Sequence, residues 1–216
     1  WDDNFGSGSW PAGYGFTVDA APGTGTSING NAANRYFGEE LLAGFDFDDD
    51  GAADLFVGDI EGDASPGAGR PGSGHGWVFY DAAELAGLDI DLGNPPSDLA
   101  TSVILGAAAG DLCGDTATAG DFDGDGVADL AIASPHHDPL GRSNAGAFHV
   151  LHGQASGWPP VIDLASLPLP TEVRIRTLIG AQGRSGSDAG DTLGYSVASG
   201  YMDADDRLDL IANEML

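Results

Sequence analysis

Positive charge and cysteine are scarce in this sequence of 216 residues. It has 7 Lys and Arg against 34 Asp and Glu, which gives a formal net charge of −27 at pH 7. Because nucleic-acid phosphates and anionic lipid surfaces attract Lys and Arg, this balance argues against both kinds of partner. The single cysteine, Cys113, excludes an internal disulfide and, beside apolar residues, predicts a small buried side chain.

Long apolar runs and helical patterns are also missing. No segment approaches the roughly 20 apolar residues of a membrane span, and only Asp81–Leu85 predicts a helical turn. The chain begins with Trp1 rather than Met, as a mature or trimmed chain does, so the lack of a leader sequence carries no information. With 35 Gly, 12 Pro and 42% hydrophobic residues, the composition is typical of a folded protein rich in turns.

Aspartate is abundant, and its spacing forms a motif. In the segment 121–129, aspartates occupy positions 1, 3, 5 and 9 and a glycine occupies position 6. Carboxylates at alternate positions of a tight loop face one centre and repel one another unless a cation lies among them. Ca2+ accepts such oxygen ligands, and the glycine permits the sharp turn that adds a carbonyl oxygen from position 7. The predicted ligands are the side chains of Asp121, Asp123, Asp125 and Asp129 and the carbonyl oxygen of Val127.

The motif occurs again at 46–54 and, with changes, at 201–209. The ligands predicted in 46–54 are the side chains of Asp46, Asp48, Asp50 and Asp54 and the carbonyl oxygen of Ala52. In 201–209 the candidates are the side chains of Asp203, Asp205 and Asp209 and the carbonyl oxygen of Arg207; Tyr201 occupies position 1 and Asp206 replaces the glycine. We expect Ca2+ in the two complete loops. The third loop is either a Ca2+ site completed by water or the Tyr201 hydroxyl, or an acidic turn without metal.

An EF-hand contains a similar run of aspartates, but its loop is closed by a bidentate glutamate at position 12. That position holds Val57 in one complete copy and Ile132 in the other, and the flanking residues are typical of strands. We therefore reject an EF-hand. Acidic turns without metal remain the alternative for each loop.

Each loop belongs to a longer repeat. Gly38, Gly114 and Gly194 precede the loops at a similar distance and lie 76 and 80 residues apart. Aromatic and β-branched runs bounded by glycine predict four strands per repeat, and a repeat of constant layout predicts a stacked or ring-like architecture. The first strands are 41–44, 116–119 and 195–198; the second are 55–57, 130–133 and 210–212; the third are 76–80 and 146–151; the fourth are 102–106 and 173–180.

The repeats divide the chain into two complete units, 37–112 and 113–192, flanked by two partial ones. Residues 1–36 are interpreted as the outer-strand remnant of a preceding unit, because Thr26–Gly30 lies where a fourth strand belongs. Residues 193–216 supply a first and a second strand around the degenerate loop. We expect a third strand in neither partial unit. The missing strands then come from a longer polypeptide or from association between copies.

This organisation resembles the FG-GAP repeats of the integrin α-subunit type. Phe37-Gly38 matches the Phe-Gly element, and Ala133–Pro135 lies where that family has Gly-Ala-Pro, whereas Gly58–Ile60 and Ala212–Glu214 depart from it. The resemblance implies an all-β fold of four-stranded antiparallel propeller blades, in a ring that is incomplete or completed by oligomerisation. It also implies structural Ca2+ and an extracellular or cell-surface location.

Two functions follow from this resemblance. The first is recognition or adhesion, in which the connections Asp59–Gly74 and Pro135–Asn144 contact a protein or carbohydrate ligand. The second is an accessory propeller of a larger secreted enzyme, such as a phospholipase, a lyase or another hydrolase. No catalytic constellation stands out in the sequence, so the chain by itself is not expected to be an enzyme.

The histidines offer one more candidate. The run His136-His137-Asp138 is either a solvated part of a surface connection or a contact for a metal or a partner. His149 and His152 fall on a predicted third strand or at its end. We expect them on the surface rather than among the metal ligands.

Overall fold

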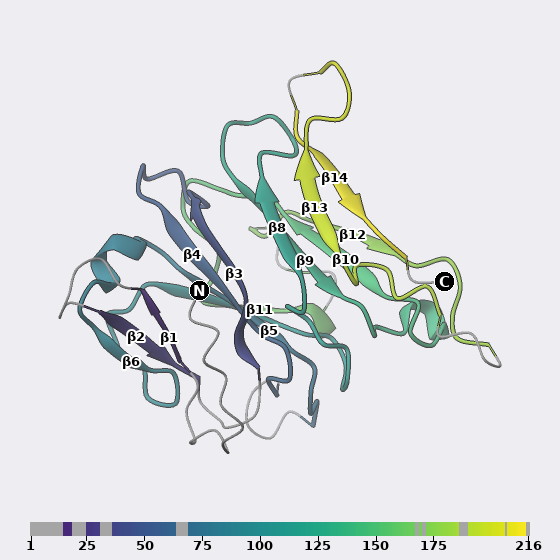
Figure 1. Cartoon of the computed structure of the whole chain (residues 1–216), viewed down its shortest axis with the longest axis horizontal. Helices are drawn as coiled ribbons and strands as arrows, with labels where there is room; N and C mark the ends of the chain where they lie inside the picture. The colour runs from purple at the N-terminus through teal and green to yellow at the C-terminus, as the bar shows by residue number, and fades with distance from the viewer. Residues whose placement is uncertain are drawn as a thin grey trace, which may run out of the picture.

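The computed structural model describes residues 15–18, 25–30, 36–63, 69–166, 169, 172–185, 190–205 and 207–214. These residues form mainly antiparallel sheets joined by loops and short 3-10 turns, and none of them lies in an α-helix. The predicted all-β class is therefore confirmed (Figure 1). In this part of the chain no helix is long and apolar enough to cross a membrane.

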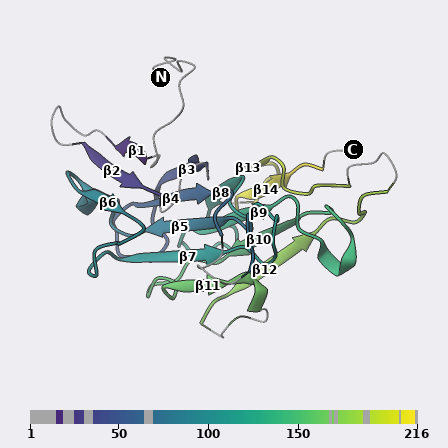
Figure 2. The same cartoon turned by 90° about the horizontal axis from the view of Figure 1, so that it is seen from below.

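The largest sheet has five strands in the order β11-β7-β5-β4-β3. Four of them follow one another in sequence and pair antiparallel with their neighbours (Figure 2): β3 (Phe37–Phe45), β4 (Asp54–Asp59), β5 (His75–Phe79) and β7 (Thr101–Leu105). The four strands predicted in this repeat are confirmed. The predicted helical turn is also present, as the 3-10 turn η1 (Ala82–Leu85).

The second repeat forms a four-stranded sheet in the order β12-β10-β9-β8. Its strands, all of them predicted, are β8 (Ala117–Gly120), β9 (Asp129–Ser134), β10 (Ala147–Leu151) and β12 (Ile175–Ile179). The short 3-10 turns η2 (Pro139–Gly141) and η3 (Leu164–Ser166) lie in its connections. Every residue of β9 is buried, because β9 is flanked by β8 and β10 and packed on its faces.

The third loop connects β13 (Val197–Gly200) to β14 (Asp209–Ala212), which pair as an antiparallel hairpin. The first strand of this repeat begins two residues later than the predicted 195–198. A turn accounts for the delay, since the Tyr195 N–H donates to the Thr192 carbonyl oxygen and Gly194 has a φ of 92°.

A three-stranded sheet contains β1 (Gly15–Val18), β2 (Thr26–Asn29) and β6 (Asp89–Asp91). Strand β2 lies at the residues predicted for a fourth strand, but it is flanked by β1 and β6 and is not the outer strand of its sheet. The expectation that no third strand precedes it is wrong, because β1 pairs antiparallel with β2 as β5 pairs with β7. The four-residue strand was missed because a stretch this short carries no clear alternation of its own.

Two further strands were not predicted, β6 and β11 (Val161–Asp163). Each lies between the third and fourth strands of one repeat and pairs in parallel with the fourth strand of the repeat before it. Ile90 of β6 pairs with Ile28, and Ile162 of β11 pairs with Ile104, and all four side chains are buried. Each of these repeats therefore adds one strand to the sheet of the repeat before it, so consecutive sheets are joined by strand pairing as well as by side-chain packing.

Close backbone contact also joins the repeats. Gly74, just before β5, forms an isolated parallel bridge with Cys113, and Gly146 forms the same bridge with Leu193. A Cβ atom on Gly74 would lie 2.2 Å from the Cys113 backbone nitrogen, so a larger residue would separate the two segments. Cys113 itself is fully buried, as predicted.

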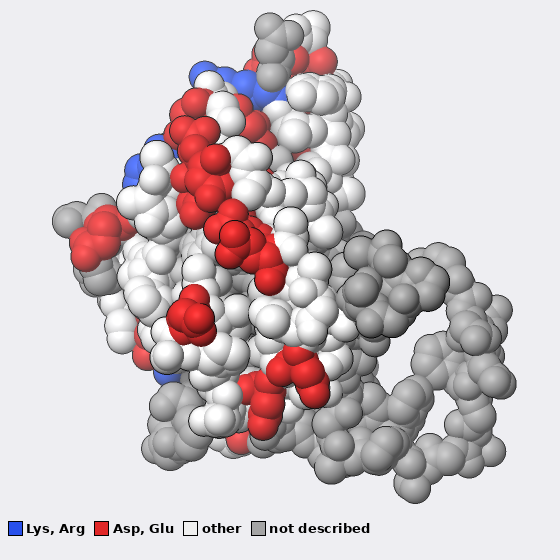
Figure 3. Space-filling model, turned by 90° about the vertical axis from the view of Figure 1, so that its left-hand side faces the viewer, with Lys and Arg blue, Asp and Glu red and all other residues white. Residues whose placement is uncertain are grey.

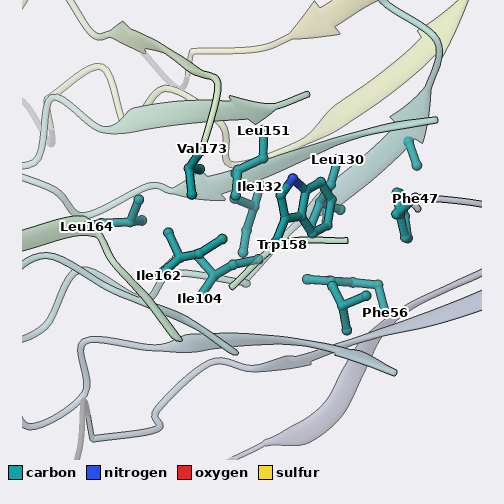
Figure 4. Packing of buried hydrophobic residues seen from close by; sticks show 14 of the residues in the cluster. Phe47, Phe56, Ile104, Leu130, Ile132, Leu151, Trp158, Ile162, Leu164 and Val173 are labelled. Carbon is teal, nitrogen blue, oxygen red and sulfur yellow. The ribbon is translucent and has the colours of Figure 1, made fainter. Parts of the chain in front are cut away.

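The main hydrophobic core lies between the two large sheets and centres on Trp158 (Figure 4). The indole ring packs 5.4 Å, centroid to centroid, from the Phe47 ring of the first acidic loop. Other fully buried members include Phe56, Ile104, Leu130, Ile132 and Leu151. Burying side chains of this size stabilises the fold by about 1.5–3 kcal/mol each, so this interface holds the repeats together.

Candidate metal centres

The three acidic loops lie along the same edge of the molecule, because each connects a first strand to a second strand and β8 packs beside both β3 and β13 (Figure 1). Figure 3 shows Asp and Glu side chains gathered in a band across one face, with few Lys or Arg side chains among them. We call residues 46–54, 121–129 and 201–209 the first, second and third acidic loop.

The aspartate at position 9 closes each loop. Asp54 is fully buried and accepts hydrogen bonds from the backbone N–H groups of Phe47 (2.8 Å) and Asp81 (3.1 Å). Asp129 does the same with the N–H groups of Phe122 (3.0 Å) and Gly153 (2.9 Å). This carboxylate therefore ties the loop to the connection that follows the third strand. Burial raises the pKa of Asp54 to about 6 and also raises that of Asp129.

The other aspartates shape the turn itself. Asp121 accepts backbone N–H groups from Gly124 (2.7 Å), Asp125 (3.1 Å) and Gly126 (2.9 Å), and Asp46 similarly accepts those of Asp50 and Gly51. At position 6, Gly51 and Gly126 have φ values of 90° and 94°, as the motif predicts. At position 7, the N–H groups of Ala52, Val127 and Arg207 donate to the aspartates at position 5.

The first loop has the donor set of a hard cation. Carboxylate oxygens of Asp46, Asp48 and Asp50 all lie within 4.8 Å of one another. Oδ1 of Asp48 is buried and has no hydrogen-bond partner in the part of the chain that the structure describes. Burial, with the charges of Asp50 and Asp46 next in size, raises the pKa of Asp48. A cluster of oxygens with one buried atom left unpaired fits a bound Ca2+, which neutralises the repulsion and accepts 6–8 such ligands.

The second loop has the same arrangement of Asp121, Asp123 and Asp125, but two nitrogenous side chains lie against it. Arg174 donates from Nη1 to Asp123 (3.0 Å) and from Nη2 to Asp125 (2.9 Å). A backbone hydrogen bond from Val127, with the Arg174 hydrogen bond and charge among the further causes, lowers the pKa of Asp125. Sequence reasoning did not identify Arg174.

His152 is the second of these side chains, and the expectation for it was wrong. Both His149 and His152 are buried rather than on the surface. Nδ1 of His152 lies 3.2 Å from Oδ2 of Asp123 and 3.2 Å from Oδ2 of Asp129. His149 instead lies on β10 with Nδ1 3.0 Å from the Thr177 hydroxyl, and burial lowers its pKa to about 3. Strand β10, which contains His149 and ends just before His152, lies between β9 and β12, and all of its residues are buried.

The third loop keeps only part of the arrangement. Asp209 accepts the Met202 N–H (2.7 Å), and Asp203 accepts the Asp205 N–H (2.8 Å). Tyr201 is exposed, and Asp206 lies outside the described residues. Among the residues that the structure describes, no group of three metal-ligating side chains includes Asp203, Asp205 or Asp209.

The His136–Asp138 run does not form a compact ligand set. His136 and Asp138 are exposed, and Nδ1 of His137 lies 2.8 Å from Oδ2 of Asp111. That hydrogen bond raises the pKa of His137. The three potential metal groups in the described residues include neither His136 nor His137.

The connections predicted to contact a ligand meet at the segment 110–112. The Gly110 N–H donates to Pro71 (3.0 Å), the Leu112 N–H donates to Gly72 (3.3 Å), and the His136 N–H donates to Asp111 (3.3 Å), each to the backbone carbonyl oxygen. These connections follow the second strands, whereas the acidic loops precede them. The two surfaces therefore lie at opposite ends of the strands.

Comparison with known proteins agrees with this repeat architecture. Residues 114–151, from the start of the second repeat to the end of β10, match the FG-GAP repeat. The chain is 27% identical over 199 residues to a phosphatidylinositol-glycan-specific phospholipase D of Dictyostelium discoideum. The match covers 86% of this chain and 18% of the relative, so the chain spans less than a fifth of that protein.

Proposed function

We propose that this chain, which contains an FG-GAP repeat at residues 114–151, is part of an extracellular Ca2+-stabilised β-propeller that recognises a protein or carbohydrate ligand. The observation that carries the proposal is the recurrence of one loop geometry at the same edge of consecutive sheets. In both complete loops, position 9 is a buried aspartate that accepts two backbone N–H groups. Each sheet of the two complete repeats is then one blade.

Ca2+ in these loops has a structural role. The proposed ligands are the side chains of Asp46, Asp48, Asp50 and Asp54 with the carbonyl of Ala52, and those of Asp121, Asp123, Asp125 and Asp129 with the carbonyl of Val127. The third loop, with Asp203, Asp205, Asp209 and the Arg207 carbonyl, is a weaker candidate because Tyr201 offers no carboxylate. When bound, the ion supplies positive charge that holds the turn closed. The aspartates at positions 1 and 5 already fold the backbone around that place through their hydrogen bonds.

The recognition surface in this proposal is the end of the strands opposite the acidic loops. Support comes from the convergence of the connections after β4 and β9 on the segment 110–112. Connecting segments on a rigid sheet scaffold are where binding residues concentrate. The ligand classes that suit such a surface are a protein and a glycan.

A second candidate is an accessory propeller in a larger secreted enzyme. The observation that favours it is the similarity to a phospholipase D, of which this chain would correspond to a minor part. In that case the catalytic residues lie elsewhere in the longer polypeptide. The two candidates share the same Ca2+-dependent fold.

The strands β1 and β14, at the two ends of the described chain, suggest how further blades could be added. Within the described residues, β14 pairs only with β13, and β1 has β2 as its partner. We propose that these edges are completed by further blades of a longer polypeptide or by a second copy, because unpaired strand edges favour association. Light scattering on the isolated chain would distinguish a monomer from an oligomer.

Binding is tested with the chain refolded in Ca2+ and applied to a glycan array and to immobilised cell-surface proteins. Recognition predicts saturable binding that is lost when residues 136–142 are replaced by a Gly-Ser linker, with the Ca2+-dependent melting temperature retained. An accessory role predicts no binding by the chain alone, and reduced activity of the full-length enzyme when 37–192 are deleted.

A further inference from the structure

The interior of the second acidic loop contains a polar atom that the Ca2+ ligand set does not use. Nδ1 of His152 lies 3.2 Å from one carboxylate oxygen of Asp123 and 3.2 Å from one of Asp129. The imidazole is only 9% exposed and Asp129 is fully buried. Neither contact has hydrogen-bond geometry, and among the described residues the buried Nδ1 has no hydrogen-bond partner. One nitrogen and two oxygens thus lie close together, and two of the three side chains are buried.

The separation of these atoms suits a small divalent cation. Zn2+ binds imidazole nitrogen at about 2.0–2.1 Å and carboxylate oxygen at about 2.0–2.2 Å, almost always in tetrahedral geometry. A tetrahedron with bonds of that length separates its ligand atoms by about 3.3 Å. The observed 3.2 Å for both nitrogen–oxygen pairs matches this edge. Three side chains would leave a fourth position for water or another ligand.

Further hydrogen bonds hold the carboxylates of Asp123 and Asp129 in place. Asp129 accepts backbone N–H groups from Phe122 and Gly153, and Asp123 accepts the guanidinium of Arg174 through the same Oδ2 that faces His152. Such hydrogen bonds orient ligating carboxylates and are a usual feature of metal centres. Arg174 is 49% exposed, whereas His152 is 9% exposed, so the arginine is the solvent-accessible one of the two.

The first loop lacks this arrangement. Backbone pairing places Tyr80 where the second repeat has His152, and Ala100 where it has Arg174, since the Tyr80 N–H bonds to Ala100 as the His152 N–H bonds to Arg174. The Tyr80 hydroxyl forms a hydrogen bond with the Ser102 hydroxyl (3.0 Å) and accepts one from the backbone N–H of Trp158 (2.9 Å). The first loop therefore offers oxygen ligands alone, which suit Ca2+.

We infer that the second acidic loop is a mixed nitrogen–oxygen metal site, formed by Asp123, Asp129 and His152, that accepts a first-row transition metal ion of the Zn2+ class. Imidazole is a good ligand for Zn2+, whereas Ca2+ takes oxygen ligands. The two complete loops thus differ in metal preference: the first suits Ca2+ alone, and in the second a Zn2+-class ion competes with Ca2+, because Asp123 and Asp129 belong to both ligand sets. The inference concerns the second loop of the proposed propeller and does not depend on Ca2+ in the first.

Co2+ is the probe, because its visible absorption reports nitrogen ligation and coordination number. The chain is stripped with chelator and titrated with Co2+ alone, and Zn2+ is then added to displace it. We expect about one equivalent of Co2+ with the intense bands of a four-coordinate site. His152→Gln should weaken Co2+ binding by at least the roughly 10–100-fold that loss of an outer-sphere partner causes.

Two matched variants make the result specific. His136→Ala removes an exposed histidine and should leave the Co2+ titration unchanged. Asp48→Asn alters the first loop and should weaken Ca2+ binding without affecting Co2+. If His152→Gln does not fold, the imidazole 15N resonances of the wild-type chain provide the readout, because Zn2+ should shift those of a single buried histidine.

The same geometry would also arise if His152 were only a cationic partner of Asp123 and Asp129. In that case Co2+ would give weak octahedral spectra or would bind equally to wild type and His152→Gln, and the inference would be overturned. Ca2+ would still raise the melting temperature in that outcome, so the proposed Ca2+-stabilised fold would stand. Loss of the Ca2+ effect alone would instead refute the proposed function.

Discussion

The backbone N–H of Ala128 donates a hydrogen bond to the carbonyl oxygen of Asp46 over 3.1 Å. This bond joins the second acidic loop to the first residue of the first loop. A second bond reinforces it, from the Gln154 N–H to the carbonyl oxygen of Phe47 (3.1 Å). The two complete loops are therefore in direct contact, and closing one of them supports the other.

Asp48→Asn should have opposite effects with and without metal. In chelator at pH 7 it removes one of several crowded carboxylates whose charged form is disfavoured by burial and by Asp50 and Asp46, so the melting temperature should rise or stay constant. In saturating Ca2+ it weakens the site by one ligand charge, so the increase that Ca2+ produces should shrink. Calorimetric melting temperatures of the wild type and of Asp48→Asn, each in chelator and in saturating Ca2+, test these two effects.

Asp98→Ala is the matched control, because Asp98 is exposed and lies outside the acidic loops. It should change the melting temperature little and equally in both conditions. A fall for Asp48→Asn in chelator as large as its fall in Ca2+ would contradict the assignment of Asp48 as a ligand.

Arg70→Met should destabilise the junction between the two large sheets. Nη1 and Nη2 of Arg70 bind the two carboxylate oxygens of Asp163 on β11 (2.6 and 2.9 Å), and Nη1 also donates to the Gly106 carbonyl oxygen (2.7 Å). Losing these partly buried charged hydrogen bonds costs about 1–3 kcal/mol in the free energy of unfolding. Urea denaturation measures it, with the exposed Arg176→Met as the control that should change little.

The same pair predicts a pH dependence. The hydrogen bond from Arg70 lowers the pKa of Asp163 below its ordinary 3.8. A carboxyl whose folded-state pKa is lowered contributes stability above its unfolded-state pKa and loses that contribution as pH falls through the folded-state value. The difference in stability between wild type and Arg70→Met should therefore be full at pH 6 and shrink below pH 3.8. A difference that is independent of pH would show that the pair is not ionic.

Tyr80→Phe should also weaken this junction. The Tyr80 hydroxyl accepts a hydrogen bond from the buried backbone N–H of Trp158 (2.9 Å) and lies 3.0 Å from the Ser102 hydroxyl. Phenylalanine fills the same space but leaves the N–H unpaired, which costs about 1–3 kcal/mol. Tyr36→Phe, at an exposed tyrosine, should leave the urea midpoint unchanged. Equal midpoints for both variants would mean that the Trp158 N–H finds another partner.

Glu40→Gln should stabilise the protein in alkaline but not in acidic solution. Burial, followed by the charges of Asp115 and Glu39, raises the pKa of Glu40 to about 7. A carboxyl with a raised folded-state pKa contributes fully below its unfolded-state value of 4.5 and loses that contribution as pH rises through about 7. Glutamine imitates the neutral form, so the melting temperature should rise at pH 8 and be unchanged at pH 4.5. Glu84→Gln, at an exposed position, is the control and should leave the melting temperature close to that of the wild type.

The sequence was sufficient to predict the acidic loops and the strands beside them, because those features are local. The glycine that needs a positive φ and the aspartates that accept the N–H groups of the turn lie within nine residues of one another. The strands carry aromatic and β-branched runs long enough to be recognised, as in β5 and β10.

Contacts between distant segments were not predictable in the same way. Strands β6 and β11 have three residues each, and β6 pairs with β2, in which Ser27 lies opposite Asp89, 62 positions away. Arg174 reaches Asp125 across 49 residues. One signal was available for the missed His152: it immediately follows the third strand, at the position that Tyr80 occupies in the first repeat.

Thermal melting of the isolated chain in chelator and in increasing Ca2+ tests the central claim most directly. Because Ca2+ binds the folded loops, the account predicts that the melting temperature rises steadily with Ca2+, corresponding to about 2.7 kcal/mol at a hundredfold excess over the dissociation constant. Mg2+ at the same concentrations should have a smaller effect, since it requires tight octahedral geometry. A melting temperature that is the same in chelator and in saturating Ca2+ would contradict the account.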